Sequence, residues 1–128
     1  ATRGGAYVGN ILATEADKRE ILSRYADIAL VDNICERIRA VLSLHFKGIY
    51  VGAFGIDMMA VARESADGFL LHPCVELNLR RTMGHLALSL TPTIAEPQRI
   101  MSISYADKYR MRIHDTTNNL LNTSLIAH

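Results

Sequence analysis

Two strand-like runs separated by a turn-forming segment place the tightest constraint on the fold of this chain. Residues 50–62 carry β-branched, aromatic and methionine side chains with few charges, and residues 69–80 are again strand-like after the turn-like segment 64–68. This pattern predicts a β-hairpin. Because side chains alternate between the two faces of a strand, the second run has an apolar face and a polar face. The polar face carries Glu76, Asn78 and Arg80.

The first strand contributes an acidic residue to the same hairpin. Asp57 lies within the otherwise uncharged run 51–62. A two-residue turn would place Asp57 directly opposite Asn78, and a register shifted by two residues would place it opposite Glu76. Both registers put the three oxygen-bearing side chains on one face, because strand pairing keeps partners on the same side of a sheet.

These three side chains form a recognisable set of ligands. Two carboxylates and an amide oxygen are hard donors that suit Mg²⁺ or Mn²⁺, and Mg²⁺ completes its shell with water and substrate phosphates. Arg80 follows Asn78 by two residues and can stabilise negative charge on a transferring phosphoryl group. The alternative interpretation is a solvated strand face with one cross-strand ion pair.

The two strands resemble the metal-binding strands of the ATP-grasp superfamily. The resemblance rests on Gly52–Met59, which contains Gly-x-Asp, and on His72–Arg80, which contains Glu-x-Asn followed by arginine. In that family these motifs carry the magnesium ligands. The resemblance implies that Asp57, Glu76 and Asn78 bind Mg²⁺ ions that bridge the phosphates of ATP. It also implies that Arg80 faces an acyl-phosphate or the carboxylate that precedes it.

The resemblance is strong over Gly52–Gly84 and covers the carboxyl-terminal, metal-binding subdomain of that family. Lys18, Lys47 and Lys108 are the only lysines, and none lies in a glycine-rich phosphate-binding segment. We therefore expect a single domain over 1–128 that is the carboxyl-terminal part of a longer enzyme and is inactive alone.

The expected activity is that of an ATP-dependent ligase. It would activate a small-molecule carboxylate as an acyl-phosphate for attack by an amine or a thiol, with Mg²⁺ (or Mn²⁺) and ATP as cofactors. The amino-terminal ATP-grasp subdomains would be its partners. Two alternatives stay open at this point: a non-catalytic ATP-grasp-like binding or scaffold domain, and a kinase on the same fold.

The remaining elements predict an α+β fold, with a mostly antiparallel sheet and the two amino-terminal helices packed on one face. The second helix is the clearest, because apolar residues recur every three or four positions from Leu30 to His45. Strands are expected over 7–12 and 99–105. Residues 116–128 show no periodicity and predict a loop or frayed helix. Helices are expected over 14–25, over the Leu30–His45 stripe and over 82–90.

Composition excludes several other functions. Fourteen basic against thirteen acidic residues give a net charge of +1, too little to attract nucleic acid. No apolar stretch is long enough to cross a membrane. Cys35 and Cys74 have no paired metal-ligand spacing, which favours a reducing, cytoplasmic location. Strand alternation predicts that Cys74 lies on the face of Glu76.

The sequence is also compatible with assembly into a homo-oligomer.

Overall fold

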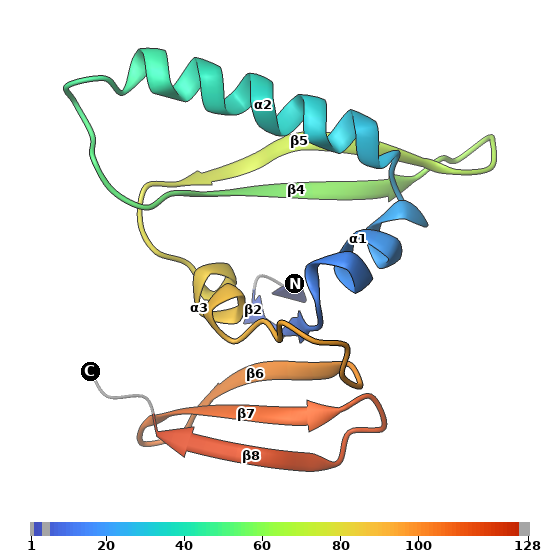
Figure 1. The fold of residues 1–128 in the computed structure, drawn as a ribbon, viewed down its shortest axis with the longest axis vertical. Coiled ribbons are helices and arrows are strands. Elements are labelled where there is room, and N and C mark those ends of the chain that lie inside the picture. Colours follow the sequence, from blue (N-terminus) through green and yellow to red (C-terminus); the bar gives the residue numbers. More distant parts are fainter. Residues whose placement is uncertain (1, 4–5, 126–128) are drawn as a thin grey trace. The chain divides into compact units, whose positions relative to one another are not determined.

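The computed structural model describes residues 2, 3 and 6–125 of the chain. The chain divides into two compact units, and each has its own sheet (Figure 1). The composition along the chain gives no sign of this division. The unit that we call the sheet unit comprises Ala1–Lys18 and Met83–His128, and the hairpin unit comprises Arg19–Thr82.

The sheet unit is built on four antiparallel strands in the order β3-β6-β7-β8. A short helix, α3, packs against β3, and β1 and β2 form a separate two-stranded sheet. The bounds are β1 Thr2–Arg3, β2 Ala6–Tyr7, β3 Asn10–Leu12, α3 Met83–Ser89, β6 Arg99–Tyr105, β7 Tyr109–Asp115 and β8 Leu120–Leu125.

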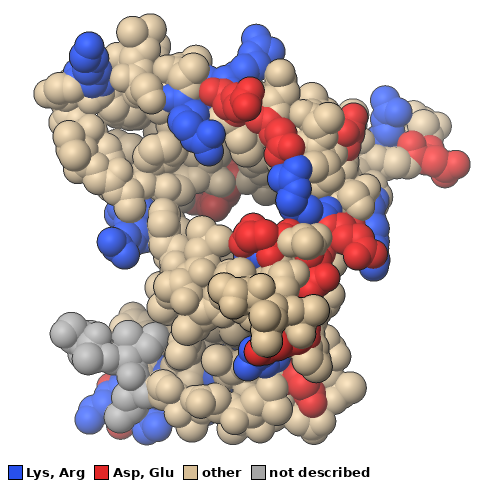
Figure 2. Space-filling model, viewed as in Figure 1, with Lys and Arg blue, Asp and Glu red and all other residues tan. Residues whose placement is uncertain are grey.

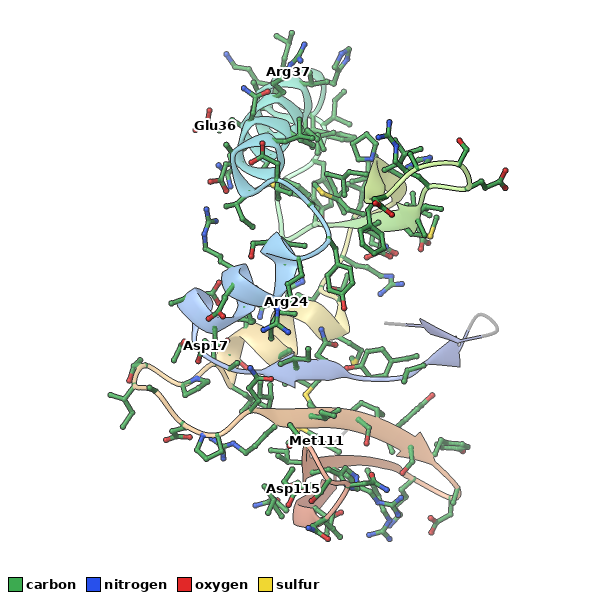
Figure 3. The ribbon with its side chains drawn as sticks, turned by 90° about the vertical axis from the view of Figure 1, so that its right-hand side faces the viewer. Asp17, Arg24, Glu36, Arg37, Met111 and Asp115 are labelled. Carbon is green, nitrogen blue, oxygen red and sulfur yellow. The ribbon has the colours of Figure 1, made fainter. Side chains whose placement is uncertain are left out.

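The core of the sheet unit lies between one face of this sheet and α3. Leu12 of β3, Met101 of β6 and Ala87 of α3 are buried together. Met101 pairs with Ile113 of β7, so strand alternation carries the same core face across both strands. The partly buried residues packed around this centre are Tyr7, Leu86, Leu90, Met111 and Ile113; Figure 3 labels Met111 on β7.

Gly9 explains why the strand expected over 7–12 is divided into β2 and β3. Its backbone approaches β6 so closely that an added Cβ would lie 2.5 Å from the carbonyl oxygen of Met101. Only glycine fits there. The Tyr7 hydroxyl donates to Oδ1 of Asn10 across this junction at 2.5 Å, and burial raises the pKa of the Tyr7 phenol.

The hairpin unit consists mainly of α2 and the antiparallel pair β4-β5. Asp27 caps α2, because its Oδ1 accepts a hydrogen bond from the N–H of Ala29 at 2.9 Å. The helix ends at Phe46, and Gly48 takes a φ of 76° in the turn that follows. The bounds are α2 Ile28–His45, β4 Gly55–Ala62 and β5 Phe69–Asn78.

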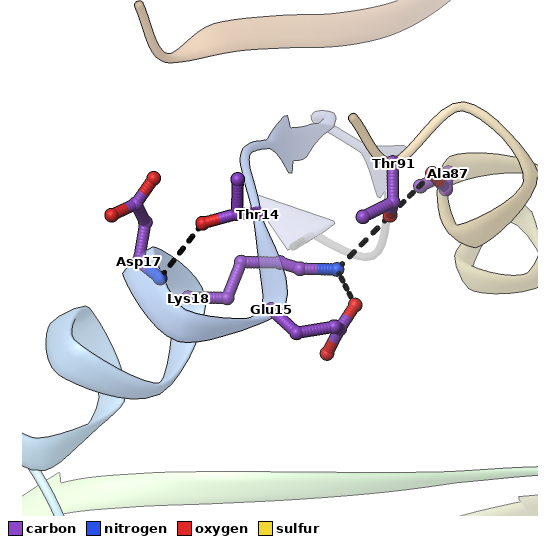
Figure 4. Close-up of polar contacts among 6 residues, drawn as sticks. All are labelled: Thr14, Glu15, Asp17, Lys18, Ala87 and Thr91. Atoms are coloured by element: carbon purple, nitrogen blue, oxygen red, sulfur yellow. Dashed lines mark hydrogen bonds and ion pairs between the residues drawn. The ribbon is translucent and has the colours of Figure 1, made fainter. Parts of the chain in front are cut away.

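The helix α1 (Glu15–Ser23) contains the residues at which one unit gives way to the other. Its amino terminus belongs to the sheet unit, where Thr14 Oγ1 accepts from the N–H of Asp17 at 3.2 Å. Figure 4 shows the Lys18 ammonium paired with Glu15 and donating to Thr91 Oγ1 at 3.2 Å. These contacts fasten the first turn of α1 to the segment after α3.

The second half of α1 belongs to the hairpin unit and is joined to α2 by an ion pair. The Arg19 guanidinium donates to both carboxylate oxygens of Asp32, at 3.0 and 2.7 Å. Hydrogen bonding to Arg19 holds the pKa of Asp32 below its ordinary value. Such a bidentate pair fixes the angle between two helices more firmly than a single contact would.

The expected α+β class with mostly antiparallel strands is confirmed. The arrangement of helices and sheets differs from the expectation, because β4 and β5 form a sheet of their own and the helix packed against β3 is α3. None of the helices in the described residues has the length and apolarity needed to span a membrane.

The expectation of a loop or frayed helix over 116–128 is wrong for 120–125, because β8 pairs with β7 there, whereas 116–119 form a turn. Residues 126–128 lie outside the described residues. As an edge strand with Asn122, Thr123 and Ser124 at its centre, β8 lacks the apolar alternation that identifies a strand in sequence.

Asp115 organises the turn that brings β8 back along β7. Its carboxylate accepts hydrogen bonds from the backbone N–H groups of Thr117 and Asn119, at 2.9 and 2.8 Å, and from both of their side chains. Asn118 adopts a φ of 69° within the turn. The hydrogen bonds from Asn119, followed by those from Thr117, lower the pKa of Asp115 from 3.8 to about 2.

This network predicts a pH-dependent contribution to stability from the Asp115 turn. Because the folded pKa lies below the unfolded value, the contribution is complete above about pH 4 and is lost as the pH falls through about 2. We expect the Asp115 carboxyl carbon to titrate near pH 2 by NMR. Asp115→Asn should remove this acid-sensitive part of the unfolding free energy, whereas Asp107→Asn in the β6–β7 turn should leave it in place. A midpoint near 4 for Asp115 would contradict the prediction.

Candidate metal-binding face of the hairpin

The register of β4 and β5 places the candidate ligands on one face. Asp57 pairs directly with Glu76, and Gly55 pairs with Asn78. Paired residues share a face, and so do residues two apart on a strand. The two carboxylates and the amide therefore project from the same side of the sheet. Of the two registers that the sequence allowed, the structure has the one with Glu76 opposite Asp57.

A bulge in β5 produces this register. Asp57 pairs with Glu76, but Met59 pairs with His72, so three residues of β5 lie opposite one residue of β4. Pro73 lies within the bulge and has no N–H to donate to a partner strand, which makes regular pairing unfavourable there. The irregularity shifts the register by two residues relative to the turn.

The bulge also reverses the predicted side of Cys74. The sequence placed Cys74 on the face of Glu76, but it lines a groove together with Ile56 and Leu77 of the opposite face. That prediction is wrong because an extra stretch of β5 breaks the simple alternation between positions 72 and 76. Cys74 is therefore turned away from the candidate ligands.

The helix α2 covers the apolar side of the hairpin. The groove between them has a volume of about 270 Å³. It is lined by Arg37, Ile38, Val41 and Leu42 of α2 and by Ile56, Cys74 and Leu77 of the hairpin. Of the helical stripe expected from the sequence, Ile38, Val41 and Leu42 thus face the strands, whereas Leu30 is 48% exposed. The helix α2 leaves the carboxylate face uncovered.

Asn78 is the most enclosed of the candidate ligands. It is 9% exposed, whereas Asp57 and Glu76 are exposed. Its partner Gly55 leaves space that Thr82 fills, because a Cβ at Gly55 would lie 2.9 Å from Thr82 Cγ2. Gly55 and Thr82 therefore shape the end of the face where Asn78 lies.

The electrostatics of the face are those of two carboxylates opposed across the sheet. Within the described residues, neither the Asp57 nor the Glu76 carboxylate has a hydrogen bond or ion pair. Like charges directly opposite on neighbouring strands destabilise a sheet. Figure 2 shows acidic and basic side chains interspersed on the visible side of the molecule, so no broad field of one sign dominates there.

The donors fit a hard divalent cation that completes its shell from elsewhere. Among the described residues, no group of three or more His, Cys, Asp or Glu side chains is placed to hold a metal. The expected set has two carboxylates and one amide. Mg²⁺ is commonly bound by one or two carboxylates, with water and substrate phosphates as its other ligands.

Arg80 lies just beyond the strand that carries the other candidate residues. The strand β5 ends at Asn78, so strand alternation no longer fixes the direction of Arg80. Its side chain is exposed, and its Nη1 donates to the carbonyl oxygen of Arg81 at 3.3 Å. Arg80 therefore lies four residues after Glu76 in the chain. Most N–H donors of its guanidinium group remain available to bind another group.

Gly55 and Thr82 shape this face, and the sequence did not reveal that they lie against each other. Gly55 precedes Asp57 in the Gly-x-Asp motif, and its role is to leave room for Thr82. Nothing in a single sequence shows that residues 27 positions apart touch. His72 and His85 flank the motif, but neither pairs with Asp57 or Glu76 in the described register.

The opposed carboxylates predict a stability effect in the absence of metal. Asp57→Asn removes one of the two facing charges and should raise the free energy of unfolding by about 0.2 to 1 kcal/mol. Chemical denaturation in a chelating buffer measures it. Asp67→Asn, in the turn of the same hairpin, is the matched control and should change little. A less stable Asp57→Asn protein would mean that Asp57 makes a favourable contact in the folded chain.

The chain was compared with protein-family models, with curated proteins and with solved structures, and none of the three comparisons finds a match.

Proposed function

We propose that this chain supplies the magnesium-binding part of an ATP-dependent ligase that activates a small-molecule carboxylate as an acyl-phosphate. The observation that carries the proposal is the direct pairing of Asp57 with Glu76, with Asn78 on the same face. The carboxylates have no partner within the described residues, as expected of groups that bind a ligand from solution.

The role of these residues in the proposed reaction is to hold and orient. Bound Mg²⁺ would neutralise phosphate charge as the γ-phosphoryl group transfers to the substrate carboxylate. Asp57 and Glu76 lie on paired strands, which fixes the spacing of their backbones. Asn78 is held at the enclosed end of the face beside Thr82. Rigid strands preserve such a geometry better than loops do.

Arg80 is the proposed catalytic residue. It lies two residues beyond Asn78, and its planar guanidinium can grip two oxygens at once. In the proposed role it binds the carboxylate and then the acyl-phosphate formed from it. Its exposed position and its single weak contact with Arg81 leave it available for this.

The proposal requires other protein segments for the nucleotide. Lys18 is engaged with Glu15 and Thr91, so its ammonium is committed to the fold. We propose that amino-terminal ATP-grasp subdomains cradle the adenine and phosphates, in a cytoplasmic enzyme. The hairpin unit has apolar surface for such partners to cover, since Leu44, Ile49 and Val51 are 75%, 78% and 97% exposed.

The first test is metal binding by the chain itself. We expect Mn²⁺ to broaden the amide resonances around 55–57 and 76–78, and Mg²⁺ to compete for the same site. Glu76→Gln keeps the size of the side chain but removes one charge, so the affinity for Mn²⁺ should fall roughly tenfold, or about 1.4 kcal/mol. Glu64→Gln, in the exposed β4–β5 turn, should bind as the unmodified chain does.

The outcomes of this titration separate the candidate functions. Binding lost only in Glu76→Gln supports the metal face. Equal weakening by Glu64→Gln would indicate loose attraction to acidic residues in general. Failure of the unmodified chain to bind Mn²⁺ with ATP present would reject the proposal and favour a binding or scaffold domain with no catalytic role.

The second test separates Arg80 from the metal ligands. Arg80→Lys should leave Mn²⁺ affinity unchanged, because the arginine is not a ligand. In a ligase that contains this segment, the same change should slow magnesium-dependent ADP release, at a cost of about 2 to 4 kcal/mol in the barrier. Arg63→Lys in the hairpin turn is the control. Unchanged turnover in Arg80→Lys would remove Arg80 from the catalytic role.

A further inference from the structure

The sheet unit has a second face that its core does not use. Strand register places Met101 and Ile113 on the face toward α3, and therefore Ser102 and Arg112 on the opposite, outer face. We define the outer face by Ile11, Ile100, Ser102, Ser104, Arg110, Arg112, His114, Leu120 and Thr123. It contains two arginines and no acidic residue.

Side chains with hydroxyl groups flank the arginines of the outer face. Arg112 lies between Ser102 of β6 and Thr123 of β8, and Arg110 lies opposite Ser104. Within the described residues, neither guanidinium has an ion pair or a side-chain hydrogen bond. Two uncompensated cations on neighbouring positions of one strand face attract an anion with two charged groups.

The spacing of the two arginines indicates what kind of anion fits. Residues two apart on a strand are about 6.6 to 6.8 Å apart, and an extended peptide with acidic residues at alternate positions repeats its carboxylates at the same distance. Each guanidinium can then bind one carboxylate with two parallel hydrogen bonds. Serine and threonine hydroxyls beside the arginines supply further donors.

The other end of the outer face accepts apolar side chains. Ile11, Ile100, His114 and Leu120 lie in that order in one row across the strands. The three apolar residues of this row, Ile11, Ile100 and Leu120, are 42%, 38% and 54% exposed. An acidic peptide with an apolar residue after its carboxylates would cover this row. One extended ligand can therefore match the charge, the spacing and the apolar surface of the outer face.

We propose that the outer face of the sheet unit binds an extended acidic peptide segment with carboxylates at alternate positions, held by Arg110 and Arg112. Single-stranded nucleic acid fits less well, because Tyr105 and Tyr109 lie on the opposite face and His114 is the one ring that the outer face, as defined, offers for stacking. A second copy of this face is disfavoured by like charge. The proposal is independent of the metal face in the hairpin unit.

The experiment uses the intact chain and three fluorescent peptides in a low-salt anisotropy titration. One peptide alternates glutamate with serine and ends in leucine, the second has the same composition with its glutamates in one block, and the third has lysine for glutamate. We expect the alternating peptide to bind at least fivefold more tightly than the block peptide. The lysine peptide should not bind.

Variants of the chain test the residues. Arg110→Gln and Arg112→Gln should each weaken binding of the alternating peptide roughly tenfold, because each loses a charge-assisted pair. The single change Arg39→Gln on α2 removes the same charge elsewhere and should not alter binding. Circular dichroism checks that the variants fold.

Several results would overturn the proposal. Equal affinity for the block and alternating peptides would show attraction by charge alone, and no binding by the unmodified chain would reject the site. Tighter binding of a single-stranded oligonucleotide or of anionic phospholipid vesicles than of the alternating peptide would assign the face to another class of ligand. The comparison of the three peptides uses the unmodified chain. It therefore tests the proposal even if one of the variants fails to fold.

Discussion

The pairing of β4 with β5 determines what the hairpin unit presents on each side. Because partners in a sheet share a face, the pair Asp57–Glu76 places both carboxylates together and turns Ile56 and Leu77 toward α2. A displacement of β5 by one residue would turn Glu76 toward the helix and separate it from Asp57. The bulge at Pro73 shifts the pairing by two residues, which leaves the two faces unchanged and brings Glu76, rather than Cys74, opposite Asp57.

Much of the local structure is readable from the sequence, because it depends on short-range patterns. The stripe of α2, the cap at Thr14, and β6 over 99–105 follow from periodicity and helix-start signals. The register was left as two alternatives because the β4–β5 connection is longer than two residues and the bulge adds a further shift.

The parts that the sequence did not reveal depend on contacts between distant residues. The neighbourhood of Gly55 and Thr82 joins the start of β4 to the chain after β5, and β8 is an edge strand stabilised by the Asp115 turn rather than by apolar alternation. The outer face of the sheet unit is another such case, since Arg112 is framed by two strands that lie before and after it in sequence. Single-sequence patterns carry no information on these pairings.

One of the two places where the chain passes between the units lies beside the Asn78 end of the hairpin. The chain passes from one unit to the other at Lys18–Arg19, inside the continuous helix α1, and again at Thr82–Met83, directly after the residue that packs over Gly55. Because Gly55 leaves room for Thr82, any larger side chain at position 55 would displace the last residue of the hairpin unit.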